Sequence, residues 1–205
     1  MDIVSKALQV RNKLTDCPEN PIDKTLAPVA PFKGKGQIKL VIIGQAPTIR
    51  NVNKRDRITC ALNLDKVSPL KTYVEKICAG LGITLDNVYA TNVFKYFYKN
   101  PPSDTPAVLA DHLQDNLALL KEELALYRHC TIITLGEPVL QLLSNKKHKI
   151  RNYWQYKDTD FHSLAATDNQ LNHCIYPFPH QPSLRQNLYK INLQSYIDFV
   201  AQRIK

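Results

Sequence analysis

Four short runs of aliphatic, β-branched and aromatic residues alternate with longer amphipathic stretches, and this alternation constrains the fold more than any other feature of the chain. The four runs, each of strand length, are residues 38–44, 87–95, 130–136 and 173–176. The stretches expected to form helices are residues 2–14, 68–81, 104–127, 137–143 and 184–203. Strands that alternate with helices predict a mostly parallel sheet covered by helices on both faces. We therefore expect an α/β protein.

The length and composition favour one globular domain over residues 1–205, because a chain of 205 residues supplies one sizeable core and contains no evident linker or repeat. Hydrophobic residues make up 44% of the chain, yet no apolar run is long enough to cross a bilayer. The N-terminus lacks the basic start and apolar centre of a secretion signal. We expect an intracellular, cytoplasmic monomer without a membrane partner.

The five cysteines are widely spaced and form no Cys-x-x-Cys pair. A scattered, odd set argues against a disulfide framework and against a compact zinc site, so we interpret these residues mostly as buried thiols. The sequence therefore predicts neither a bound metal nor a cofactor.

The chain is basic, with 27 Lys and Arg residues against 18 Asp and Glu residues and a formal net charge of +9. A surplus of this size favours a polyanionic partner, since cationic side chains release condensed counterions from nucleic-acid phosphates. Basic residues gather beside predicted strand ends, within 33–39, 50–57 and 146–151. A solvated face explains each group alone, whereas their shared position in loops indicates a binding surface.

Unusual residues follow the first predicted strand, at the edge of a parallel sheet where ligands bind in such folds. This strand ends at Gly44, and the turn that follows begins with Gln45, Ala46 and Pro47. Backbone amides in such a turn can face a ligand, although a simple exit from the strand explains the same residues.

Two further strand ends carry polar residues. Asn92 lies inside the second run, where its side chain must satisfy both a carbonyl and an amide group. It either bonds to a neighbouring loop or reads the edge of a base.

The proline-rich segment 177–185 cannot continue a helix or a central strand, because proline lacks an amide donor and fixes φ. His180 in this loop either transfers protons near neutral pH or merely satisfies backbone groups.

Four segments of the chain together resemble the uracil-DNA glycosylase superfamily. They read Gly-Gln-Ala-Pro at 44–47, Tyr-Ala-Thr-Asn-Val-Phe-Lys at 89–95 with Pro-Pro at 101–102, Thr-Leu-Gly-Glu at 134–137, and His-Gln-Pro-Ser-Leu-Arg at 180–185. The resemblance extends over about residues 38–200. It implies a three-layer α/β/α sandwich with a central four-stranded, mainly parallel sheet. It also implies hydrolysis of the N-glycosidic bond of a deaminated base in DNA, after that base has left the duplex stack.

The resemblance assigns a base pocket to the first two motifs. The backbone of Gly44, Gln45, Ala46 and Pro47 would line this pocket, and Asn92 would pair with the pyrimidine edge. Many relatives carry an acidic residue at the second or third position of the first motif, where it orients the attacking water. Gln45 occupies such a catalytic position here, but neither it nor Ala46 can act as a base.

The last motif is assigned to catalysis and to DNA contacts. His180 would stabilise the charge that develops on the leaving base. Ser183, with nearby backbone, would hold a DNA phosphate, and Arg185 suits the same oxygens. Leu184 lies where several family members place an apolar wedge that fills the space of the extruded base.

The chain also departs from the family pattern at positions that orient the attacking water, bind an iron–sulfur cluster or stack on the base. The carboxylates that could replace the missing acid are Asp56 and Asp65. Tyr96 occupies the position at which the iron–sulfur branch has a cysteine, so no cluster is expected. The aromatic residues considered for stacking on the base, none with the spacing of the family, are Phe97, Tyr98 and Trp154.

The leading hypothesis is a DNA glycosylase-like enzyme that removes uracil or a related deaminated base from single- or double-stranded DNA. The first alternative is a catalytically weak or inactive nucleic-acid-binding relative of the same fold, because the water-orienting acid is missing. The second alternative is a nucleotide-binding α/β protein of different chemistry.

Overall fold

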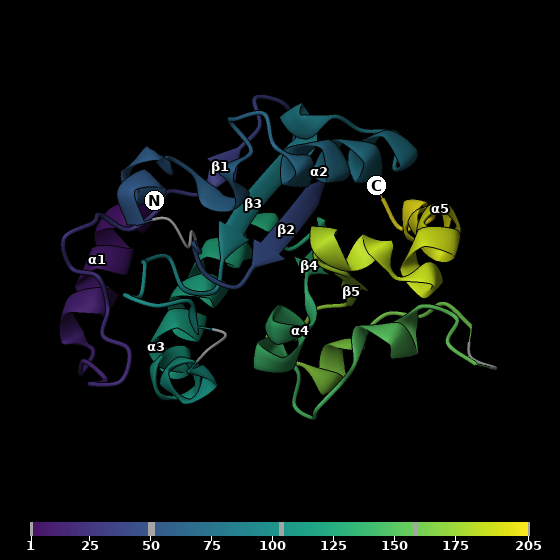
Figure 1. Ribbon diagram of the computed structural model, residues 1–205. Helices are drawn as coiled ribbons and strands as arrows, with labels where there is room; N and C mark the ends of the chain where they lie inside the picture. Colours follow the sequence, from purple (N-terminus) through teal and green to yellow (C-terminus); the bar gives the residue numbers. More distant parts are fainter. Residues whose placement is uncertain (1, 49–51, 103–104, 158–159, 205) are drawn as a thin grey trace.

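A five-stranded sheet forms the centre of the computed structural model, which describes residues 2–48, 52–102, 105–157 and 160–204. Its strands are β1 (Phe32–Lys33), β2 (Leu40–Gly44), β3 (Val88–Asn92), β4 (Thr131–Leu135) and β5 (Ile175–Phe178). They lie in the order β1-β3-β2-β4-β5, as Figure 1 shows for the central ones. The last four are mutually parallel, whereas β1 is antiparallel to β3.

The predicted α/β class and the four parallel strands are confirmed, and β1 is an addition to them. The last strand was expected at 173–176 with a loop from 177, but β5 extends to Phe178, because it lies at the edge of the sheet, where a strand tolerates proline. Every residue of β2, β3, β4 and β5 is buried, as expected for a parallel sheet covered on both faces. Strand β1 has only two residues, and both keep partial or full exposure. A strand this short has no periodic pattern in the sequence, so it escaped the prediction of a four-stranded sheet.

Five α-helices complete the fold, namely α1 (Ile3–Lys13), α2 (Pro69–Gly80), α3 (Pro106–Leu124), α4 (Glu137–Leu143) and α5 (Asn187–Ala201). The chain moves from β2 to β3 in one direction across the sheet and from β3 to β4 in the other. Right-handed crossovers therefore place α2 and α3 on opposite faces. In Figure 1, α2 lies with α5 on one side of the sheet and α1 with α3 on the other, in agreement with their mutual contacts.

The helix bounds follow local capping chemistry. The side chain of Asp2 accepts a hydrogen bond from the Ser5 amide at the start of α1, and Ser68 accepts one from Lys71 at the start of α2. The predicted start of α3 at residue 104 lies outside the described residues. Helix α5 begins later than expected, because residues Gln181–Arg185 form a separate short turn, η8. Among the helices in the described ranges, none is long and apolar enough to cross a membrane.

The segment that the sequence left unassigned, 146–172, contains the short turns η6 (Ile150–Tyr153) and η7 (Ala166–Asp168). It is anchored by Trp154, which is fully buried and donates from Nε1 to the Pro177 carbonyl at 2.6 Å. This bond fastens the segment to β5. As a result, residues near 150 lie beside the loop that contains His180.

Candidate active site

A cavity of about 620 Å³ opens at the carboxyl ends of the parallel strands. The predicted site residues that line it are Gly44, Gln45, Ala46, Pro47, Asn92 and His180. They come from the ends of β2, β3 and β5, which meet because parallel strands end at one edge of a sheet. The structure thus brings together residues that are up to 136 positions apart.

Gly44 and Asn92 form the floor of this cavity as paired residues of neighbouring strands. A Cβ atom built on Gly44 would lie 2.4 Å from Asn92 Oδ1 and 2.7 Å from Leu62 Cδ2. Both distances are far shorter than any van der Waals contact. Glycine is therefore required at this position so that the Asn92 carboxamide can lie across the end of β2.

The turn after Gly44 is fastened to the segment that follows β3. The Gly44 carbonyl accepts from the Val93 amide at 2.9 Å, and the Gln45 carbonyl accepts from the Phe94 amide at 2.9 Å. The amide N–H groups of Gln45 and Ala46 donate to no residue in the described part of the chain. A rigid turn with unpaired donors at a cavity can bind a carbonyl oxygen of a ligand.

Asn92 is buried, with 4% of its surface exposed, yet its carboxamide forms no hydrogen bond with any residue that the structure describes. Because Asn92 lines the larger cavity and its amide atoms are open to it, the carboxamide is available to bind a group that enters there. The carboxamide offers one acceptor and one pair of donors. This combination matches the edge of a pyrimidine base.

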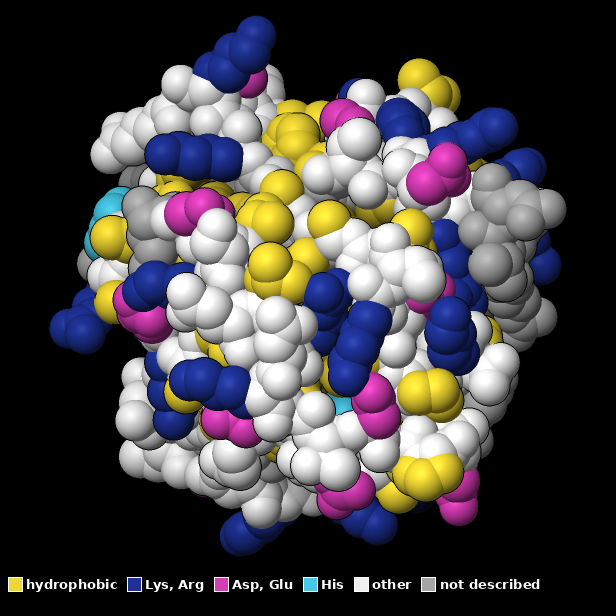
Figure 2. Space-filling view, turned by 90° about the vertical axis from the view of Figure 1, so that its left-hand side faces the viewer, with side chains coloured by type: hydrophobic (Ala, Val, Ile, Leu, Met, Phe, Trp, Pro, Cys, Tyr) yellow, Lys and Arg dark blue, Asp and Glu magenta, His cyan; other side chains and the backbone are white. Residues whose placement is uncertain are grey.

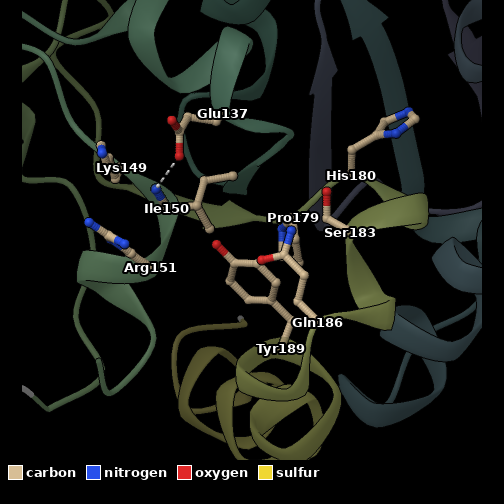
Figure 3. Close-up of a pocket in the computed structure, with 9 residues that line it drawn as sticks. All are labelled: Glu137, Lys149, Ile150, Arg151, Pro179, His180, Ser183, Gln186 and Tyr189. Atoms are coloured by element: carbon tan, nitrogen blue, oxygen red, sulfur yellow. Dashed lines mark hydrogen bonds between the residues drawn. The ribbon is translucent and has the colours of Figure 1, made fainter. Parts of the chain in front are cut away.

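His180 follows β5 and lies where this cavity meets a second, smaller one. Its side chain remains accessible to solvent, but partial burial lowers the pKa of the imidazole. The ring is therefore neutral at pH 7 and presents one N–H donor. In Figure 3 the ring points away from Glu137 and Gln186, which line the smaller cavity.

The smaller cavity, of about 280 Å³, is polar and carries two cationic residues, Lys149 and Arg151 (Figure 3). They line it together with Ser183 and Gln186 from the loop and helix after β5. The one carboxylate among its lining residues, on Glu137, accepts from the Ile150 amide at 3.3 Å and so holds the opposite wall in place. The sequence identified Lys149 and Arg151 as part of a basic cluster but not as neighbours of His180.

The three residues predicted to contact DNA have different surroundings. Ser183 lines the smaller cavity, and its amide donates to the His180 carbonyl at 2.8 Å. Leu184 is only partly exposed and packs against the hydrophobic core. Arg185 is exposed and lines neither cavity.

Neither alternative carboxylate lies at either cavity. Asp56 is exposed, and Asp65 accepts hydrogen bonds from Thr59 and from the Cys60 thiol. Burial raises the pKa of Asp65, but these hydrogen bonds outweigh it and lower the pKa overall. Within the described ranges, no Asp or Glu residue lines the larger cavity. Cys60 also lines this cavity, and burial raises the pKa of its thiol to about 11 and keeps it protonated.

The aromatic residues considered for base stacking lie elsewhere. Phe97, Tyr98 and Trp154 are buried in the core, and none of them lines either cavity. Aliphatic and small side chains form the cavity walls instead. Lining residues that the sequence did not indicate include Leu62, Asn63, Ser68, Leu70 and Val139. Leu62 and Asn63 adopt left-handed backbone angles, with φ of 57° and 52°. No sequence motif predicts this conformation.

The positive charge of the protein is dispersed. On the face shown in Figure 2, Lys and Arg side chains are scattered among acidic and uncharged ones and form no continuous stripe. Of the predicted basic loops, Arg50 lies outside the described residues. A dispersed charge of this kind attracts phosphates without selecting a sequence.

The chain matches a known protein family. The model of the uracil DNA glycosylase superfamily matches residues 31–202, which include the whole sheet and every residue that lines the two cavities. Helix α1 lies outside the matched part. No curated protein sequence matches the chain.

Proposed function

This chain belongs to the uracil DNA glycosylase superfamily, and on that premise we propose that it hydrolyses the N-glycosidic bond of uracil or a related deaminated base in DNA. The observation that carries the proposal is the convergence of Gly44, Asn92 and His180 on one cavity. The two groups that a leaving pyrimidine needs are a carboxamide open to the cavity and a neutral imidazole. The protein would act as a monomer, inside the cell where DNA is present.

The base enters the larger cavity only after extrusion from the helix, because the glycosidic bond is shielded inside stacked DNA. The Asn92 carboxamide then accepts from the ring N–H of uracil and donates to the adjacent carbonyl oxygen. Cytosine presents the reverse pattern and is rejected. The unpaired amides of Gln45 and Ala46 are further donors for a base oxygen.

His180 stabilises the leaving base. Breaking the N-glycosidic bond moves electron density onto the base, while the sugar gains oxocarbenium character. The neutral imidazole donates its N–H to the base oxygen on which charge develops, where a fixed donor is worth most. Its loop follows strand β5, which contains Pro177, and itself carries Pro179 and Pro182, so the donor is held in place before the substrate arrives.

The attacking water has no carboxylate to orient it in the larger cavity, as far as the described residues extend. The Gln45 side chain can hold a water by hydrogen bonds but cannot accept its proton. A general base contributes a factor of about 10² to 10⁴, so we expect slow turnover. The same observation favours a second candidate function, namely recognition of the base without its removal.

The smaller cavity suits the DNA backbone. Lys149 and Arg151 supply positive charge, and the Ser183 hydroxyl supplies a donor for a phosphate oxygen. Since His180 borders both cavities, a phosphate held in the smaller one would position the neighbouring nucleotide at the larger one.

Incubation with uracil-containing single- and double-stranded oligonucleotides, followed by alkaline strand cleavage, tests the proposal. Cleavage at the uracil, with none in matched thymine-containing strands, is the expected result. Tight binding to the uracil strand without cleavage would select the second candidate. Equal, salt-insensitive affinity for both strands would refute both functions and favour a nucleotide-binding protein of different chemistry.

A further inference from the structure

A buried ion pair lies directly behind the residue that faces the base. The ammonium group of Lys95 is 2.7 Å from Glu123 Oε2, and the two side chains are 1% and 0% exposed. Lys95 is on the turn that follows β3, whereas Glu123 is near the end of α3. The pair therefore joins the strand end that carries Asn92 to a helix on one face of the sheet.

The Lys95 ammonium group donates two hydrogen bonds in addition to its ion pair with Glu123. Besides Glu123, Nζ donates to Thr91 Oγ1 at 2.9 Å and to the backbone carbonyl of Asn92 at 2.7 Å. The Lys95 side chain therefore reaches back from the segment after β3 to the last two residues of that strand. Because the Asn92 carboxamide has no hydrogen-bond partner among the described residues, its orientation depends on how firmly its backbone is held.

Glu123 is held in turn from the opposite side. Its Oε1 accepts from the Tyr89 hydroxyl at 2.5 Å, and Tyr89 belongs to the same strand as Asn92. Burial lowers the pKa of Lys95, and the charge of Glu123 partly opposes this shift. The lysine, the glutamate and the tyrosine therefore form one connected, fully buried network.

The network is an unusual choice for stability alone. Replacing a buried ion pair by well-packed hydrophobic residues is often neutral or stabilising, because desolvation of two charges offsets their attraction. If this part of the core only had to be filled, Met in place of Lys95 and Leu in place of Glu123 would suffice. What those residues cannot do is hold the carbonyl of Asn92.

We propose that Lys95 is a positioning residue for base recognition, which fixes the Asn92 backbone with support from Glu123 and Tyr89. The inference rests on the proposed function, because it assigns Asn92 to the base. In the bound state the ammonium group keeps the carboxamide aligned with the pyrimidine edge. Selectivity for the base thus depends on a residue that never touches it.

The test is a triple variant, Tyr89→Phe with Lys95→Met and Glu123→Leu, which removes the network without leaving one of its charges unpaired. The matched control is Tyr96→Phe, which removes a buried hydroxyl that accepts from Asn116 on the same helix, α3, at 2.7 Å. Excision of uracil, affinity for undamaged duplex and melting temperature are measured for both. The triple variant is expected to lose at least tenfold in excision while its melting temperature and undamaged-duplex affinity stay near those of the control.

A folded triple variant that excises uracil as fast as the control would overturn the inference. If the triple variant fails to fold, the pair Thr91→Val and Thr91→Ser decides the question, since only serine keeps the hydroxyl that accepts from Lys95. Excision at least threefold slower for Thr91→Val than for Thr91→Ser supports the role. Equal rates refute it.

Failure of the proposed function has a different signature, because the wild type would then show no preference for uracil. The positioning role retains its own readout, the side-chain amide signals of Asn92 in protein labelled with ¹⁵N-asparagine. One sharp pair is expected in the wild type. Broadened or doubled signals are expected in the triple variant or, if that variant does not fold, in Thr91→Val. A sharp, unshifted pair in that variant would refute the inference whatever the substrate.

Discussion

Replacement of Gly44 by alanine would place a methyl group at the floor of the candidate active site. The new Cβ would lie 2.4 Å from Asn92 Oδ1 and 2.7 Å from Leu62 Cδ2, whereas ordinary contacts begin at 3.4 Å. The tip of Leu62 can rotate away. The Asn92 oxygen must retreat by about 1 Å, and a displacement of that size at a reacting group can cost about a hundredfold in rate.

We therefore expect Gly44→Ala to lower the rate of uracil excision about 100-fold, which corresponds to about 2.7 kcal/mol of transition-state stabilisation. Overpacking of this kind also costs about 1–3 kcal/mol of folding stability. A variant with the same kind of clash away from the site separates the two effects. Gly80→Ala provides it, since its Cβ would lie 2.5 Å from Ile197 Cγ2 between α2 and α5.

The assay is single-turnover excision from a uracil oligonucleotide, with melting temperature and undamaged-DNA affinity measured in parallel. If the wild type binds uracil-containing DNA without cleaving it, its preference over undamaged DNA replaces the rate. Gly80→Ala should retain wild-type activity at a comparable loss of stability. A folded Gly44→Ala protein with wild-type excision and wild-type base preference would refute the argument that Asn92 reads the base from this position.

Four further predictions concern the two cavities. Asn92→Ala should abolish the preference for uracil-containing over undamaged oligonucleotides in a binding titration, and an equal loss for both would instead mark Asn92 as a structural residue. His180→Asn should lower turnover about 100-fold with unchanged DNA affinity, and full activity in a folded variant would remove His180 from the mechanism. The joint variant Lys149→Gln and Arg151→Gln should reduce the slope of log affinity against log salt by about 2, and an unchanged slope would mean that the smaller cavity holds no phosphate. Since burial lowers the pKa of His180, stability should be retained above pH 6.5 and decline as the pH falls through and below it. The difference in melting temperature between pH 7.5 and pH 5 should thus be smaller for His180→Asn than for the wild type.

Strands and helices could be predicted from the sequence because burial in this fold follows local periodicity. The runs around Ile42 and Ile133 consist of aliphatic and β-branched residues, as a sheet covered on both faces requires. Ser68, followed by a proline, marked the start of α2 for an equally local reason, since a cap satisfies amides within one turn. Strand β1 was missed because its two residues become a strand only through pairing with the edge of β3.

The meeting of Gly44, Asn92 and His180 also followed from local signals, once the strands were known to be parallel and therefore to end at one edge. The remaining walls could not be inferred in this way. Leu62 belongs to no motif, and its place opposite Gly44 depends on two successive left-handed residues. Phe97 and Tyr98, which follow β3 in the chain, pack into the core instead.

Contacts between distant elements were decided only by the tertiary structure. Arg151 lies next to the His180 loop because Trp154 is bonded to the Pro177 carbonyl, and no pattern in a polar segment reveals such a bond. Lys95 reads in the sequence as one more positive charge that favours a polyanion. The packing of α3 against β3 makes it a buried cation instead, because the ammonium group reaches Glu123 and the Asn92 carbonyl only where those two elements meet.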